Sequence, residues 1–270
     1  MRIYEPEFLE TPENPVARIG FAVMLWLRAA GRALCILGEG CLMTPLFLTR
    51  RAEIGRQLFI CGIKSFGVVS VMACFTGMIL ALQAGIILRD YGKTEEVGNL
   101  VANVMCREMG PMMTGLIVAA SVGAGIAAEL ATMQVSEEVD ALQVMNVNPA
   151  RYLVMPRLVA MVVMVPALTV YANFIGILGG MLVSGTQLAV SQEQYYNTAI
   201  STLKNRHLWL GMSKSVVFAF IITAVSCYQG FFARNGAVGV GTATRKTVVH
   251  SFLLILVIGY SLTWLFYYND

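Results

Sequence analysis

Long apolar segments separated by short polar ones dominate the pattern of this sequence. Five segments contain no Asp, Glu, Lys or Arg, and they span residues 66–88, 109–128, 158–190, 215–233 and 247–269. A helix needs about 20 apolar residues to cross the hydrocarbon core of a bilayer, because each residue rises about 1.5 Å. The pattern therefore predicts an all-α integral membrane protein with five transmembrane helices.

The second predicted span begins earlier than its uncharged segment. If the helix starts near Val97, Arg107 and Glu108 lie about ten residues in, roughly 15 Å deep. An ionisable pair inside a membrane is a functional-site hypothesis by default, and Pro111 removes a backbone donor and bends the helix directly after the pair. The alternative is that both side chains lie at the interface and pair with each other. Gly176 and Gly180 form a GxxxG packing signal in the third span.

The N-terminal region has a different pattern. Residues 1–15 are acidic and proline-bearing and read as a tail. From about residue 16 to residue 40, Arg18, Arg28, Arg32 and Glu39 form one charged stripe on an otherwise apolar helix. Such a helix suits the membrane interface, in plane; the alternative, a sixth span, would bury two arginines in mid-helix. We expect an interfacial region at 16–56 and a five-span membrane domain at 57–270.

The segment between the second and third spans predicts an amphipathic helix on the inner side. Val135, Val139 and Leu142 share one helical face, with Met145 close by. The opposite face is polar and acidic, with Ser136, Glu137, Asp140 and Gln143. A helix on the membrane surface would be basic, so an acidic helix at about 134–147, roughly four turns long, favours docking onto a basic groove of a protein partner. A solvated acidic face is the alternative.

The charges agree with a membrane protein of defined orientation. Only 13% of the residues are charged, against about 25% in soluble domains, and the net charge of +3 is too small to indicate nucleic acid. Of 19 Lys and Arg, 13 lie inside if the N-terminus is cytoplasmic, so the positive-inside rule predicts a cytoplasmic N-terminus and an outer C-terminus. The cations assigned to the outer loops are Arg89, Lys93, Lys204, Arg206 and Lys214.

Motifs that carry catalytic or metal chemistry are missing from the sequence. It has no GxxxxGK[ST] phosphate loop, no HExxH and no GxSxG. His207 and His250 have no nearby ligand set, and the six cysteines are scattered without a CxxC pair. Glu108 is the lone acid within the spans, so a relay of acids for proton-driven transport is also missing. A membrane domain without an energy source, but with a docking helix, suggests that the energy comes from another subunit.

Four motifs, in order and in register, resemble permeases of the MlaE/YrbE family, the membrane subunits of MCE-associated ABC transporters. They are GMILALQ at 77–83, REMGP at 107–111, EEVDALQVMNVNP at 137–149 and GVGTATRKTVV at 239–249. One departure is Ser121, where many relatives carry an arginine. The first 50 residues show little specific resemblance.

The resemblance implies a permease that works as a homodimer in the bacterial inner membrane, with a cytoplasmic N-terminus and a periplasmic C-terminus. Its partners would be a cytoplasmic ABC ATPase, a periplasmic MCE-domain protein and, as a further candidate, a small cytoplasmic STAS-type protein. The cargo would be phospholipid or a related lipid. ATP and Mg would bind the ATPase, so this chain would be no enzyme and would hold no cofactor or metal.

The resemblance also assigns residues to two tasks. Coupling to the ATPase is expected from Glu137, Glu138, Asp140, Ala141, Leu142 and Met145. Lipid binding is expected from Leu82, Gln83, Arg107 and Glu108. Two other functions stay open on the sequence: a membrane scaffold that recruits a partner through the acidic helix without transport, and a gradient-driven carrier.

Overall fold

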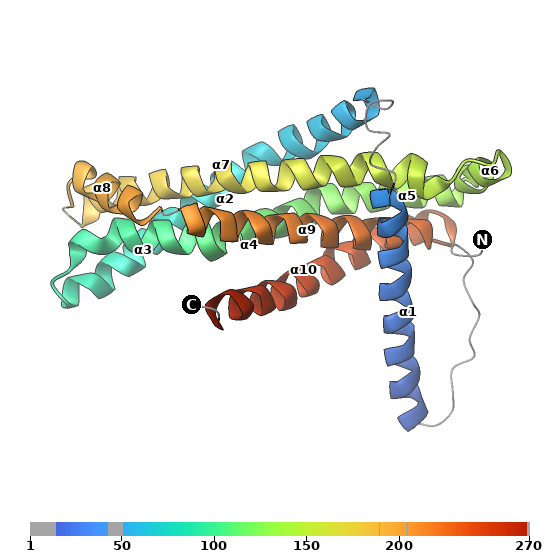
Figure 1. The fold of residues 1–270 in the computed structure, drawn as a ribbon, viewed down its shortest axis with the longest axis horizontal. Coiled ribbons are helices and arrows are strands. Elements are labelled where there is room, and N and C mark those ends of the chain that lie inside the picture. Colours follow the sequence, from blue (N-terminus) through green and yellow to red (C-terminus); the bar gives the residue numbers. More distant parts are fainter. Residues whose placement is uncertain (1–14, 43–50, 189, 204, 269–270) are drawn as a thin grey trace. The chain divides into compact units, whose positions relative to one another are not determined.

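The computed structural model describes residues 15–42, 51–188, 190–203 and 205–268, and these form helices and no strand (Figure 1). The predicted tail therefore falls, except for Pro15, outside the described residues. The α-helices are α1 (Pro15–Leu42), α2 (Arg51–Asp90), α3 (Val97–Val104), α4 (Gly110–Val118), α5 (Ala124–Val135), α6 (Glu138–Val144), α7 (Met155–Gln187), α8 (Gln192–Thr202), α9 (Asn205–Phe231) and α10 (Gly236–Tyr268). A short 3-10 turn, Thr94–Glu96, precedes α3.

Five helical stretches are long and apolar enough to cross a membrane, which confirms the predicted number of spans. They are Arg51–Asp90, Thr94–Val135, Ala150–Gln187, Arg206–Phe231 and Gly236–Phe266. The second span starts well before its uncharged segment, as the sequence predicts, and it carries Arg107 and Glu108 within it. Each of the five helical stretches begins before its uncharged segment.

The second span is not a uniform α-helix. Two π-helical turns, Met105–Met109 and Ala119–Gly123, separate α3, α4 and α5. The first of them contains Arg107 and Glu108, and Pro111 follows in the first turn of α4. A π turn inserts one extra residue into the helical ladder and is often found at functional sites. The local wide turn thus coincides with the ionisable pair that the sequence singles out.

The described residues fall into two compact units. The first unit comprises residues within 1–57, 122–160 and 220–251, and the second comprises residues within 58–121, 161–219 and 252–270. Each of the five spans contributes residues to both units, α1 and α6 belong to the first, and α8 belongs to the second.

In the second unit, α2 and α7 approach at glycines. A Cβ on Gly77 would collide with the carbonyl oxygen of Gly176, and a Cβ on Gly179 would collide with that of Cys74. Backbones this close are the usual outcome of small residues in membrane helices. Gly176 and Gly180 therefore act as the packing positions that the GxxxG pattern predicts.

Helix α8 is short and polar, but one aromatic side chain fixes it in the second unit. Ser191 caps the helix by accepting a hydrogen bond from the Gln194 N–H at 3.2 Å. Tyr195 is buried and donates a hydrogen bond to the Ile177 carbonyl at 3.2 Å, so its phenol joins α8 to α7. Burial raises the pKa of Tyr195, because the ionised phenol would lose its hydration.

In the first unit, α1 forms where the sequence predicts an amphipathic helix, and Figure 1 draws it crosswise to α5. Ile36 and Leu37 are buried, whereas Leu27 and Leu34 are exposed. The guanidinium of Arg32 lies 5.6 Å from the ring centroid of Phe232, a cation–π contact with the end of α9. The placement of this helix in the membrane plane stays a prediction.

The predicted inner helix at 134–147 is wrong in its bounds and length. The structure ends α5 at Val135 and begins the separate α6 at Glu138, which has 7 residues. Glu137 between them has a φ of 60°, and Asn146 after α6 has a φ of 59°. Left-handed backbone at these two residues cannot continue a right-handed helix, so the apolar periodicity runs across two breaks that it does not reveal.

Candidate functional site

A charged cluster lies inside the spans, at the π turn of the second span. Lys214 on α9 donates from its Nζ to Oε1 of Glu108 at 2.6 Å. The Lys214 side chain is buried, whereas that of Glu108 is 38% exposed. A charge-assisted hydrogen bond of this length in a poorly hydrated site is a strong interaction, so the pair compensates two charges that would be costly alone in a membrane.

The ammonium group of Lys214 has its three donors occupied. Besides Glu108, Nζ donates to the Arg107 carbonyl at 3.1 Å and to the Thr263 hydroxyl at 2.8 Å. The Thr263 hydroxyl also lies 3.1 Å from each carboxylate oxygen of Glu108. Three spans therefore meet in this cluster of Glu108, Lys214 and Thr263, and the partly exposed carboxylate of Glu108 keeps acceptor capacity for a further donor.

The sequence-based assignment of Lys214 to an outer loop is wrong. The structure places Lys214 within the span Arg206–Phe231, where it is 3% exposed. The uncharged segment begins at Ser215, directly after the lysine, so it leaves Lys214 out of the predicted span. The signal that could have found it is the apolar sequence on its N-terminal side, Leu208-Trp209-Leu210-Gly211-Met212, which shows that the span begins earlier.

The other residues assigned to lipid binding differ in how exposed their side chains are. Arg107 is half-buried next to Glu108, and its carbonyl joins the cluster. Leu82 is half-buried and Gln83 is exposed on α2. The role of Leu82 and Gln83 stays a prediction.

Helix α6 presents the residues assigned to coupling on its open side. Glu137, Glu138, Asp140 and Ala141 are exposed, Leu142 is half-buried, and Met145 follows the helix with 72% of its surface exposed. Val139 is fully buried and anchors the helix. The exposed side therefore combines acidic groups with the apolar side chains of Val144 and Met145, a mixture that suits a protein partner better than water.

Ser121, where the resemblance implies an arginine, contacts the first span. Its hydroxyl lies 3.4 Å from that of Ser65 on α2 and donates to the Ile117 carbonyl at 2.7 Å. A neutral hydroxyl contact thus occupies the position where the resemblance implies a cation.

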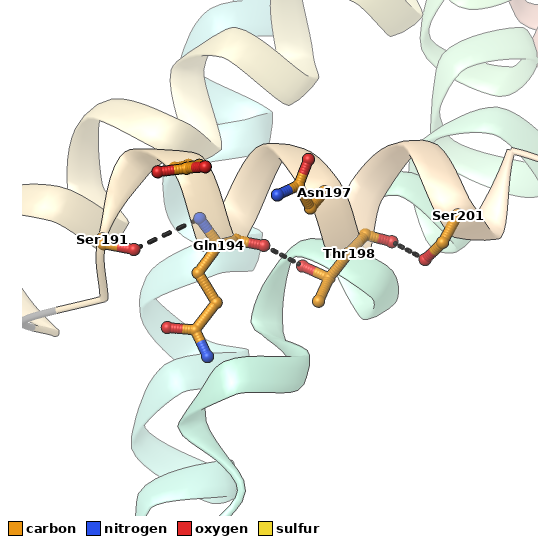
Figure 2. A pocket seen from close by; sticks show the side chains of 6 residues that line it. Ser191, Gln194, Asn197, Thr198 and Ser201 are labelled. Carbon is orange, nitrogen blue, oxygen red and sulfur yellow. Dashed lines mark hydrogen bonds between the residues drawn. The ribbon is translucent and has the colours of Figure 1, made fainter.

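A shallow hollow lies along α8, but its three hydroxyl groups are already bonded to the helix itself. Figure 2 shows Ser191, Gln194, Thr198 and Ser201 bonded in sequence along the helix. Thr198 donates to the Gln194 carbonyl at 2.9 Å, and Ser201 donates to the Thr198 carbonyl at 2.9 Å. Hydroxyls that bond to their own helix have little capacity left for a ligand, so the hollow is a weaker candidate than the charged cluster.

Comparisons with known proteins agree with the features above. A family model described as "Permease MlaE" matches residues 54–265. A probable ABC transporter permease protein of Rickettsia prowazekii is 40% identical over 223 residues, which is 83% of this chain and 85% of the relative. A probable ABC transporter permease protein of Synechocystis is 30% identical over 91% of this chain and 94% of the relative. The intermembrane phospholipid transport system permease protein MlaE of Haemophilus influenzae is 30% identical over 93% of this chain and 96% of the relative.

Proposed function

Because this chain belongs to the MlaE permease family, we propose that it moves phospholipid or a related lipid between the inner membrane and a periplasmic MCE-domain protein. The observation that carries the proposal is the ion pair of Glu108 and Lys214 within the spans. A lipid has apolar tails and a charged headgroup, so its path needs an apolar wall with a few charged groups. The Haemophilus relative is named as a phospholipid transport permease.

In this proposal Glu108 is the residue that meets the headgroup. Lys214 spends its donors on Glu108, Thr263 and the Arg107 carbonyl, so it holds the carboxylate in place instead of binding a phosphate itself. The exposed part of Glu108 can accept from an ammonium or hydroxyl donor of a headgroup. The guanidinium of Arg107, half-buried beside it, is the candidate for the phosphate.

The energy would come from a cytoplasmic ABC ATPase that binds ATP and Mg and docks on α6. The acidic, partly apolar surface of α6 supports this assignment, and the positive-inside rule supports a cytoplasmic position for α6, with the N-terminus cytoplasmic and the C-terminus periplasmic. Two copies of the chain would form the permease, each with one docking helix. Closure of the ATPases would then displace α6 and the spans attached to it.

Reversing the charge of Asp140 tests the docking. Asp140 is exposed on α6, so Asp140→Arg leaves the packing of Val139 intact and places a cation against the expected basic groove. We expect co-purification of the ATPase with the permease to be lost while membrane insertion is retained. Glu193→Arg, an equally exposed acid on α8, is the matched control and should keep the ATPase bound. Unchanged co-purification with Asp140→Arg would remove α6 from the interface.

Removing the carboxylate of Glu108 tests the lipid path. We expect Glu108→Ala to lower lipid transfer about tenfold or more, since one charge-assisted hydrogen bond is worth about 1.5–3 kcal/mol, and to leave ATPase binding unchanged. Glu108→Gln, which keeps the shape and one acceptor, should retain more transfer than Glu108→Ala. Transfer is measured between liposomes and the acceptor protein, with mass spectrometry of lipids that co-purify with the complex.

These measurements also separate the competing functions. A complex that carries no lipid and whose ATPase ignores added lipid would favour a recruiting scaffold. Transport that collapses with an uncoupler but withstands vanadate would favour a gradient-driven carrier.

A further inference from the structure

A second ion pair lies in the first unit, between the two helices that flank the segment containing α6. Glu129 is in the middle of α5, before the segment, and Arg157 is in the first turn of α7, after it. Nη2 of Arg157 lies 2.9 Å from Oε2 of Glu129. The pair therefore joins the last part of the second span to the start of α7 in the third span.

Arg157 is in an unusual state for a charged side chain. It is 3% exposed, and its Nε and Nη1 atoms are buried without a hydrogen-bond partner among the described residues. Only one of the two parallel bonds that a guanidinium can form with a carboxylate is therefore made. A buried cation with a single anionic contact is sensitive to any displacement of that anion.

The second carboxylate oxygen of Glu129 faces another arginine. Oε1 lies 3.6 Å from Nη2 of Arg56, near the start of α2, and Arg56 also lies 3.5 Å from Glu53. These groups line a cleft of about 410 Å³, together with Tyr152 and Pro156 among others. The Glu129 side chain is 44% exposed. Its carboxylate thus bridges two arginines, one oxygen to each.

Hydrogen bonds of Asn148 also hold the connection between α6 and α7. The side-chain oxygen of Asn148 accepts from the Ala150 N–H at 2.9 Å, and its Nδ2 donates to Glu39 of α1 at 3.2 Å. Asn148 therefore starts the helical turn that leads into α7 and ties it to α1. These two hydrogen bonds tie the connection between α6 and α7 both to α1 and to the helical turn that leads into α7.

We propose that Glu129 and Arg157 are positioning residues that transmit a displacement of α6 to the second and third spans together, an inference that rests on the proposed function. With the pair intact, α5 and the start of α7 move as one body. Without it, the docked ATPase still moves α6, but the two spans respond separately. The pair then sets how much lipid moves for each ATP hydrolysed, and it leaves docking itself unaffected.

Glu129→Gln in the complex of permease and ATPase tests this role. The amide keeps the size of the side chain but removes the charge that holds Arg157. We expect the ATPase to co-purify at the wild-type level and to hydrolyse ATP, while the number of lipids transferred per ATP falls about threefold or more, within the range of single residues in a coupling network. Glu129→Asp, which keeps the carboxylate, should restore a large part of that ratio. Glu53→Gln, which removes the other acid beside Arg56, should leave it unchanged.

The outcomes separate the inference from the proposed function. A wild-type complex that transfers no lipid contradicts the proposed function. A wild-type complex that transfers lipid, together with a Glu129→Gln complex of equal lipid-to-ATP ratio, overturns the coupling role. Loss of ATPase binding in Glu129→Gln also overturns it, because the pair would then act on docking. If Glu129→Gln does not insert into the membrane as a folded protein, Arg157→Lys decides: it keeps the cation but not the planar fork, and an unchanged ratio would reject the inference.

Discussion

At the scale of single residues, charge compensation within the spans depends on contacts between helices. Arg107 and Glu108 stand out in the sequence because two charges interrupt an apolar helix and a proline follows. Lys214 and Thr263 contact Glu108 from α9 and α10, and no pattern along one chain states which helices lie next to each other. The same reason explains why the pairing of Glu129 with Arg157 was not predicted.

Close helix contacts at glycine give a prediction for one residue. Gly77→Ala places a methyl group against the backbone of Gly176, and overpacking of this kind costs about 1–3 kcal/mol. Gly67 lies on the same helix with nothing near its would-be Cβ, so Gly67→Ala should be neutral or stabilising by up to about 1 kcal/mol. The check is the thermal unfolding midpoint of each variant in detergent. Equal midpoints would show that α2 and α7 do not pack at Gly77.

At the scale of helices, the hydrophobic pattern predicts the number of spans more reliably than the residues at which each helix begins and ends. The early start of the second span can be predicted, because a membrane helix can continue through Arg107 as long as the charge of this arginine is compensated. The break between α5 and α6 does not, since Glu137 adopts a left-handed backbone that its side chain does not favour. A glutamate there carries no local signal, and the surrounding packing, with Val139 fully buried, decides the turn.

The attachment of α8 gives a prediction for an element, with two adjacent tyrosines as a matched pair. Tyr195 is buried and bonded to α7, whereas Tyr196 is 55% exposed. Tyr195→Ala should cost about 3–5 kcal/mol of unfolding free energy by leaving a cavity, and Tyr195→Phe about 1 kcal/mol by losing the hydrogen bond. Tyr196→Ala should change it by less than about 0.5 kcal/mol. Protease sensitivity of the segment around residue 203 reports detachment of α8, and similar effects of both alanine variants would contradict the packing.

At the scale of the whole molecule, the number of spans could be predicted because bilayer thickness fixes the length of a helix. The division into two compact units could not, since every span contributes residues to both. Span lengths carry no information on which part of a helix packs more tightly with its neighbours. The close backbone contact of Gly77 with Gly176 lies within the second unit, and the ion pair of Arg157 with Glu129 lies within the first.

Helix α10 differs from the other spans in how little of it is covered. Only 11% of its most apolar window is buried, against 50% for α7 and for α9. Its exposed side chains include Leu253, Val257, Tyr260 and Trp264, which recur at helical spacing on one face. Lipid could cover this face at no cost, but the proposed homodimer needs a contact surface, and α10 has the least buried apolar window among the five described spans.

Cysteine cross-linking in membranes tests that assignment. In a background with Cys35→Ser and Cys74→Ser, which removes the cysteines that are not buried among those described, Val257→Cys should form a disulfide-linked dimer on mild oxidation. Leu182→Cys is the matched control, since this leucine on α7 is similarly exposed, at 55% against 63%. A disulfide needs Cα atoms within about 7 Å, so only a face at the dimer contact reacts efficiently. Efficient dimer formation by Leu182→Cys but not by Val257→Cys would move the interface from α10 to α7.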